Sequence, residues 1–284
     1  MNPVNVEIEV ETEVEIESRG SYEEAEVSNS RNTQSKLARP ELRQACDALL
    51  VRLLEDGNRR HASVMTRLAD PAVLRRFFIR STIENVRRIE LMRKINPLVC
   101  VKAAALDPLL CKKWGLYAAD EGLHSRMFAR DLHTLGVGDD VIYATPPLFS
   151  TELLCGYLYH TLEEDGPMAV VASGYYVESI SRMSQPGWLD RIEAVLGAGA
   201  TRGSRAHLLL DDQDGHIDLA WNLSMRLVKQ PEDEARFVDH VKKLHALLAA
   251  YVGEVFEVVL GEGGDASTTA ADVVRPREPA RSAS

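Results

Sequence analysis

Two segments contain carboxylates at positions that are more typical of metal ligands than of solvent-exposed charges. Glu178 follows eight uncharged residues, 170–177, so on a helix its side chain lies among apolar neighbours and needs a cation. An ion pair with Arg182, four residues on, is the alternative. Glu121 and His124 form Glu-x-x-His, and positions three apart share one helix face, so the two side chains can hold one metal ion. The same spacing also occurs on ordinary solvated faces.

A third segment, 207–216, combines imidazoles and carboxylates at four-residue intervals. His207 and Asp211 form one such pair, and Asp212 and His216 form another. Each pair lies on one face of a regular helix and can reach a single ion. Exposed charges at a helix break are the alternative.

The fourth candidate is Glu84, for which nearby Arg80, Arg87 and Arg88 offer ordinary ion pairs as the alternative. Together the four segments supply four carboxylates, whose charge two divalent ions neutralise, and neutral imidazoles leave that balance unchanged. Oxygen and imidazole ligands suit iron or manganese, and the absence of Cys-x-x-Cys argues against a thiolate zinc site. The sequence therefore predicts two Fe(II) ions, or Mn, held by Glu84, Glu121, His124, Glu178, Asp211 or Asp212, and His216, with His207 as a further candidate.

The segments that position these residues are predicted to be helical. Apolar residues recur at three- and four-residue intervals, with Pro near several starts and Gly near several ends. The sequence predicts an all-α fold, a single bundle of about seven or eight helices within residues 39–260. The expected helices are 40–54, 71–94, 108–135, 149–164, 167–184, 188–196, an interrupted 204–228, and 231–260.

Composition limits the classes of partner. The net charge is −10, and residues 1–30 alone hold nine Glu and one Arg, so we expect an acidic, disordered extension over 1–38 and a disordered tail over 261–284. Without a basic stripe, nucleic acid is not an expected partner. We see no run of about 18 apolar residues, so no membrane span is expected. Four widely spaced cysteines suit a reducing compartment, which predicts a cytoplasmic protein.

On these motifs the sequence resembles the haem-oxygenase-like di-iron oxidases and oxygenases, most closely the fatty-acid decarboxylases that form 1-undecene. The likeness runs from about residue 45 to 250. The resemblance implies a haem-oxygenase-like fold, two irons and O₂ as co-substrate. It is carried by Thr-Ile-Glu84, Ala-Asp-Glu121-Gly-Leu-His124, Gly-Tyr175-Tyr-Val-Glu178 and His207-Leu-Leu-Leu-Asp211-Asp212.

The last motif departs from the family pattern, His-x-x-x-Asp-x-x-His, because His216 arrives about two residues late. If Asp211 is a ligand, His216 lies on the wrong side of a regular helix. A π-bulge or a break near Gly215 restores it, or Asp212 replaces Asp211.

The resemblance implies oxidation of a small molecule, with no catalytic residue beyond the metal centre. Oxidative decarboxylation, C–C cleavage of an amino acid and N-oxygenation all occur in this group, and we expect a small carboxylate or amino acid in specialised metabolism. Tyr175, Tyr176 and Trp221 are candidates to line its pocket, and Arg87 or Arg182 to assist; core packing and surface charge are the alternatives.

A homodimer is expected by analogy. The rival interpretations are two. One is a metal-free enzyme of the same fold that hydrolyses thiamin-type compounds or oxidises a quinone precursor, and the other is a non-catalytic helical binding protein.

Overall fold

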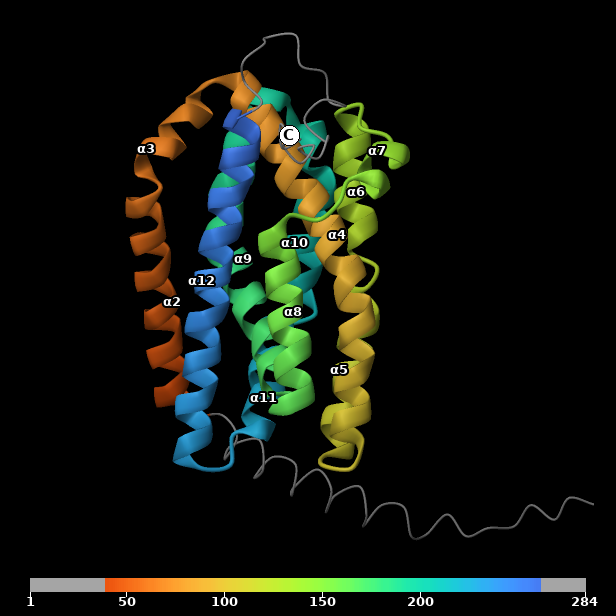
Figure 1. Ribbon diagram of the computed structural model, residues 1–284, viewed down its shortest axis with the longest axis vertical. Helices are drawn as coiled ribbons and strands as arrows, with labels where there is room; N and C mark the ends of the chain where they lie inside the picture. Colours follow the sequence, from red (N-terminus) through yellow and green to blue (C-terminus); the bar gives the residue numbers. More distant parts are fainter. Residues whose placement is uncertain (1–38, 262–284) are drawn as a thin grey trace, which may run out of the picture. The chain divides into compact units, whose positions relative to one another are not determined.

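The computed structural model describes residues 39–261, and all regular structure within them is helical (Figure 1), which confirms the all-α prediction. There are more helical segments than predicted, because the expected helix 108–135 is divided and short segments that were not expected occur at 62–65, 66–69, 139–144 and 198–201, whereas the expected helices 167–184 and 188–196 form one continuous helix. The predicted extension 1–38 and almost all of the predicted tail lie outside the described residues. The helices are α2 (Pro40–Arg60), α3 (Ala62–Met65), η2 (Thr66–Ala69), α4 (Pro71–Ala104), α5 (Pro108–Glu121), α6 (Ser125–Thr134), α7 (Asp139–Ala144), α8 (Phe149–Glu164), α9 (Met168–Leu196), η3 (Ala198–Thr201), α10 (Arg202–Gln213), α11 (His216–Leu227) and α12 (Pro231–Gly261).

Two helices continue through a proline at which the sequence predicts an end. Helix α4 begins as expected, with Asp70 accepting a hydrogen bond from the Ala72 N–H, but it passes Pro97 and ends at Ala104. Helix α9 likewise passes Pro186. Proline removes one backbone hydrogen bond, and the buried apolar face beyond it, Val99 in α4, offsets that loss.

Two helix breaks fall within the ligand motifs, one after Glu121, which was not expected, and one near Gly215, which was. The predicted helix 108–135 divides between Glu121 and Ser125, so Glu-x-x-His spans the end of α5 and the following turn. Helix α10 ends at Gln213, and α11 begins at His216. Gly215 lies between them with a φ of +65°, a left-handed conformation that favours glycine.

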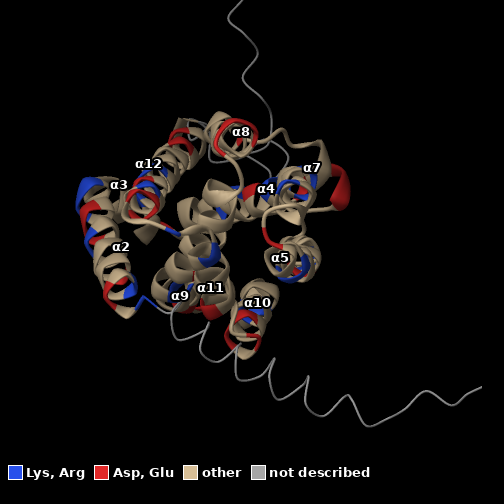
Figure 2. Cartoon of the chain, turned by 90° about the horizontal axis from the view of Figure 1, so that it is seen from below, with Lys and Arg blue, Asp and Glu red and all other residues tan. Residues whose placement is uncertain are grey.

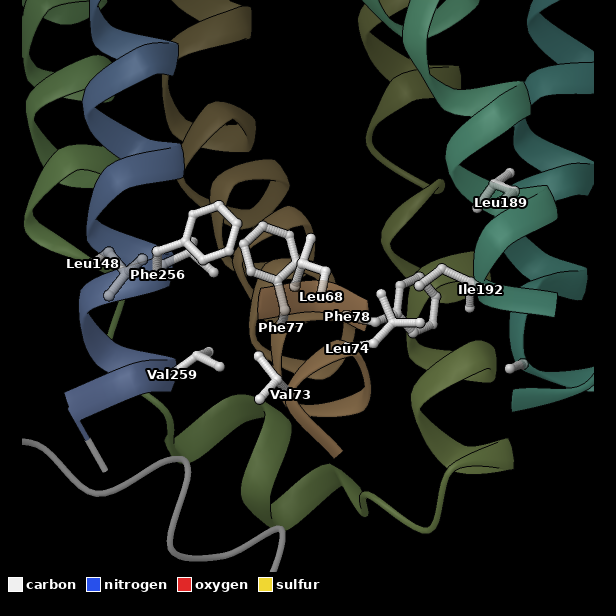
Figure 3. Packing of buried hydrophobic residues seen from close by; sticks show 12 residues of the cluster. Leu68, Val73, Leu74, Phe77, Phe78, Leu148, Leu189, Ile192, Phe256 and Val259 are labelled. Carbon is white, nitrogen blue, oxygen red and sulfur yellow. The ribbon is translucent and has the colours of Figure 1, made fainter. Parts of the chain in front are cut away.

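Packing around α4 fixes the frame of the bundle. At its N-terminal end, the Phe77 ring packs against that of Phe256 in α12 (Figure 3), with 4.5 Å between the ring centroids. The Phe77 ring also lies 5.6 Å from that of Trp188 in α9. Further along, Ile83 and Ile89 join a buried cluster that includes residues of α6. Helices α4 and α9 therefore hold the elements between which the ligand motifs lie.

Helix α12 is long and apolar enough to cross a membrane by length and composition, with a mean hydropathy of 1.5 over 18 residues. The run is not continuous, because His245, Glu254 and Glu257 interrupt the apolar residues at the end of α12. In the structure α12 packs against α4, α8 and α9, with Phe237, Val241 and Phe256 buried. Only 28% of the apolar 18-residue window is buried in this packing, and the cellular location stays a prediction.

Charges of both signs are interspersed over the described helices (Figure 2). In this view neither sign forms a continuous stripe. The expectation that nucleic acid is not a partner stays a prediction.

Candidate metal centre

Six ligand-type side chains converge between α5, α9, α10 and α11. They form two overlapping groups, and within each group the potential ligand atoms lie within 4.8 Å of one another. Glu121 belongs to both groups and is partly buried, whereas the other five side chains are buried. The first group is Glu121, His124 and His207; the second is Glu121, Glu178, Asp211 and His216.

Contacts in the cluster have the spacing of ligands around an ion. His124 Nδ1 lies 3.2 Å from Glu121 Oε2, and His207 Nδ1 lies 2.8 Å from Asp211 Oδ2. His216 Nδ1 lies 3.1 Å from Glu121 Oε1 and 3.2 Å from Asp211 Oδ1. Two ligand atoms roughly 2.1 Å from one ion, at right angles, are about 3.0 Å apart. The cluster therefore has the dimensions of a coordination shell.

Six atoms of the cluster are buried without hydrogen-bond partners among the described residues. They are Glu121 Oε1, Asp211 Oδ1 and Oδ2, and the Nδ1 atoms of His124, His207 and His216. Unsatisfied buried polar atoms cost free energy and are rare, so six in one cluster need a common explanation. Divalent ions bound between them satisfy all six, and carboxylate plus imidazole is a donor set that iron and manganese accept.

The protonation of the cluster shows how strongly these groups interact. Burial, followed by the charges of Glu121 and Asp211, raises the pKa of Glu178 to about 8. Contacts with Asp211 and Glu121 raise the pKa of His216 to about 10. Burial opposes ionisation of Asp211, but contacts with His207 and His216 prevail and lower its pKa to about 2. In the absence of metal ions, protons bound to Glu178 and His216 therefore offset the repulsion between the carboxylates.

Tyr117 is a site residue that sequence reasoning missed. Its buried hydroxyl donates a 2.9 Å hydrogen bond to Glu178 Oε1, and its ring packs 5.3 Å from that of His216. The clue was its position four residues before Glu121, on the same helix face. Gly174 makes room for it, because a Cβ there would lie 3.3 Å from the Tyr117 hydroxyl and 3.6 Å from the Trp114 ring.

The structure decides between the two adjacent aspartates. Asp211 is buried within the cluster, whereas the Asp212 side chain is 66% exposed and lies 3.5 Å from Arg182. The break at Gly215 turns the chain so that His216 comes back to Asp211. Of the two alternatives, replacement of Asp211 by Asp212 is therefore wrong, and the helix is broken at Gly215 instead.

Glu84 does not join the cluster, contrary to the prediction. Its carboxylate forms a buried ion pair with Arg80 at 2.5 Å and accepts hydrogen bonds from the Leu148 N–H and the Thr151 hydroxyl at the start of α8. The ordinary ion pair considered as the alternative is thus what the structure shows. With Glu84 removed and His207 added, the ligand set has three carboxylates and three imidazoles.

The predicted pocket aromatics pack elsewhere. Tyr175 donates its hydroxyl hydrogen to Asp47, and its ring lies 5.1 Å from that of Trp221. The Tyr176 hydroxyl is 3.1 Å from His245 Nδ1. These side chains face α2, α11 and α12 and fill the core, which corrects the expectation that they bind substrate.

The predicted arginines are engaged elsewhere too. Arg87 pairs with Glu90 along α4, and Arg182 lies against Asp212 at the surface. Neither lines the cavity beside the cluster.

A cavity of about 70 Å³ adjoins the cluster and reaches Glu121 and His207. It lies between α4, α5, α6, α9 and α10. Such a volume holds roughly five to seven water-sized spheres. Its apolar wall consists of Ile89, Met92, Trp114, Phe128 and Val177, and polar side chains complete it.

No family model matches the sequence, and no curated protein matches it. A similar solved structure is the crystal structure of a domain of unknown function with a heme oxygenase-like fold from Shewanella denitrificans OS217. The TM-score is 0.66 at 21% identity, over 81% of this chain and 97% of that one. The chain therefore has a haem-oxygenase-like fold, and at this identity the similarity shows the fold alone.

Proposed function

We propose that this protein is a non-haem di-iron oxidase or oxygenase that uses O₂ to oxidise a small carboxylate or amino acid. The observation that carries the proposal is the cluster of six buried ligand atoms that lack hydrogen bonds and lie at coordination-shell spacing. The haem-oxygenase-like fold supports it as a scaffold that brings side chains of several helices to one interior point.

In this proposal Glu121, His124 and His207 hold one ion, and Glu178, Asp211 and His216 hold the other, with Glu121 shared. Three carboxylates against two divalent ions leave one net positive charge. A buried site disfavours uncompensated charge, so one further anion is expected as a ligand or close neighbour. The metal pair, when bound, supplies the O₂ chemistry.

The chain's own residues orient ligands and exclude water. The Tyr117 hydroxyl fixes the orientation of the Glu178 carboxylate, as hydrogen-bonded partners of metal ligands do. Phe128 packs 5.0 Å from the His207 ring and holds it in place. Apolar side chains on one side of the cavity would displace water from the part of the substrate that they contact.

The metal-free hydrolytic enzyme of this fold is the weaker alternative, because it needs a reactive cysteine. Burial raises the pKa of Cys155 to about 11, and burial together with Asp47 raises that of Cys46 to about 11. Neither thiol forms a thiolate nucleophile near neutral pH.

The test is anaerobic loading with Fe(II), followed by a metal count and exposure to O₂. We expect two irons per chain, and O₂ consumption that a suitable substrate accelerates. His124→Ala should lower the iron content with the helices retained. His133→Ala is the matched control, because His133 lies half-exposed against Asp139 in α6, the helix that His124 precedes, and this variant should keep both irons. Absence of iron in the wild type, or full loading of His124→Ala, would overturn the proposal.

A further inference from the structure

The cavity beside the metal cluster contains a cation without a counter-ion. Arg88 lines the cavity from α4, and within residues 39–261 its guanidinium has neither a hydrogen bond nor an ion pair. Asn85, one turn earlier, lines the same cavity and likewise has no hydrogen bond within that range. Both residues are partly buried, and both line the cavity, where a ligand can reach them.

The neighbouring arginines of α4 differ from Arg88 in having partners. Arg80 pairs with Glu84, and Arg87 pairs with Glu90. Arg93 donates to the Gly122 carbonyl and to the Ser125 hydroxyl, and so fixes the turn that carries His124. The two glutamates of α4 on either side of Arg88, Glu84 and Glu90, are thus already paired with other arginines. The guanidinium of Arg88 is therefore available to pair with an anionic ligand.

Helix α9 contributes further polar side chains to the lining of the same cavity. Gln185 of α9 donates a 3.0 Å hydrogen bond to Ser181 Oγ, which leaves the Ser181 hydroxyl hydrogen to be donated into the cavity. Ser181 is one turn beyond Glu178 on α9. Guanidinium, amide and hydroxyl donors together suit a carboxylate, which accepts a bidentate pair from arginine.

We infer that Arg88, assisted by Asn85, binds the carboxylate of a small organic acid, so that the opposite end of that acid faces the metal centre. The inference rests on the proposed function for the identity of the reaction, but the anion site stands on the cavity itself. The cavity volume of about 70 Å³ suits an acid of a few non-hydrogen atoms. The carboxylate is then the anchor, and the reacting group is a C–H bond or an amine at the far end.

The probes are butyrate and its neutral amide, butyramide, which match in size and differ in charge. Each is titrated into the full-length chain, both metal-free and loaded with Zn(II), and binding is followed by saturation-transfer NMR. We expect butyrate to bind at least tenfold more tightly than butyramide. Arg88→Gln should weaken butyrate at least tenfold and abolish the preference, and Asn85→Ala should weaken it less.

Arg87→Gln is the matched control, since it removes the adjacent arginine, which is paired with Glu90 and lies outside the cavity. This variant should bind butyrate as the wild type does. If Arg88→Gln fails to fold by circular dichroism, Arg88→Lys, which keeps the charge and loses the bidentate geometry, should weaken butyrate by a smaller factor. Unchanged butyrate affinity in the Arg88 variants, or no preference for butyrate in the wild type, would overturn the inference.

The two proposals fail in different ways. A chain that binds no Zn(II) or Fe(II), yet binds butyrate through Arg88, removes the di-iron function and keeps the anion site. The converse result is butyrate that binds only to the metal-loaded protein, and equally well to its Arg88→Gln variant. Butyrate is then a metal ligand, a result that contradicts the anion site at Arg88 and is consistent with the metal centre.

Discussion

Glu84 and Glu178 look alike in the sequence and differ in the structure. Each is a glutamate within a long helix, and their relative exposures are 1% and 3%. Glu84 has Arg80, the Leu148 N–H and the Thr151 hydroxyl around it. Glu178 has one hydroxyl, from Tyr117, and otherwise faces carboxylates and an imidazole. Burial marks both glutamates as special, but only their partners distinguish a structural carboxylate from a ligand.

The Glu84 site is a helix-capping device. The Leu148 N–H and Thr151 belong to the N-terminal turn of α8, where backbone N–H groups lack intrahelical partners. Glu254 of α12 caps the next two N–H groups, those of Phe149 and Ser150. Two carboxylates thus hold α8 between α4 and α12, and no ion is needed there.

The largest expected effect is loss of metal on removing Glu178. Glu178→Ala deletes a ligand of the second group, so iron content should fall from two per chain to at most one, with helix content unchanged by circular dichroism. Elemental analysis after anaerobic loading provides the measurement. Two irons per chain in this variant would show that Glu178, like Glu84, is a structural carboxylate and not a metal ligand.

The reciprocal substitution should affect folding and leave metal binding intact. Glu84→Ala leaves Arg80 buried without its counter-ion, which costs about 3–5 kcal/mol of unfolding free energy. Glu90→Ala breaks a partly exposed pair with Arg87 and should cost at most about 1 kcal/mol. Urea unfolding of the metal-free chains measures both values. A large loss of iron in a folded Glu84→Ala protein would restore Glu84 as a ligand.

Metal binding to the cluster should also depend on pH. At pH 7 the metal-free cluster keeps a proton on Glu178, whose pKa is raised to about 8, and one on His216, whose pKa is raised to about 10. Metal binding displaces both protons, so affinity must rise with pH, by up to about a hundredfold per unit below pH 8. Calorimetry in buffers of different ionisation enthalpy counts the protons released. An affinity that is flat from pH 6 to 8 contradicts this coupling.

The position of His216 in the cluster depends on the left-handed backbone conformation of Gly215. Gly215→Ala places a side chain at a φ of +65°, which costs about 1 kcal/mol, although no atom lies close enough to clash. We expect this loss of stability and weaker binding of the second metal, because His216 follows directly. Gly215→Asn, which tolerates the left-handed conformation better, should lose less. Equal stability of all three proteins would show that the break does not depend on glycine.

The smallest effect is expected at Asp212. Its exposed contact with Arg182 should contribute less than about 0.5 kcal/mol, so Asp212→Asn should keep both stability and iron. Asp211→Asn, one residue earlier, should lower the iron content. A reversal of this order in the metal analysis would exchange the roles of the two aspartates.

Local patterns predicted the elements and part of the site. Apolar periodicity and Pro71 predicted the start of α4, and Glu121, His124, Glu178 and His216 do converge. The end of α4 was wrong because tertiary burial around Val99 outweighs the cost of Pro97, which no local pattern shows.

The errors at the site have the same origin. Leu148 and Thr151 lie 64 and 67 residues from Glu84 in the sequence, so the groups that satisfy its carboxylate are not visible locally. Tyr175 and Tyr176 are close to Glu178 in sequence, yet the rotation of α9 turns them toward α2 and α12. His207 and Asp211 were recognisable by spacing, but only the left-handed Gly215 brings His216 back to them.

The most direct measurement is anomalous diffraction at the iron absorption edge from crystals of the Fe(II)-loaded protein. The account predicts two peaks, one between His124 and His207 and one among Glu178, Asp211 and His216, with Glu121 beside both. A single peak, no peak in the cluster, or iron beside Glu84 would contradict it.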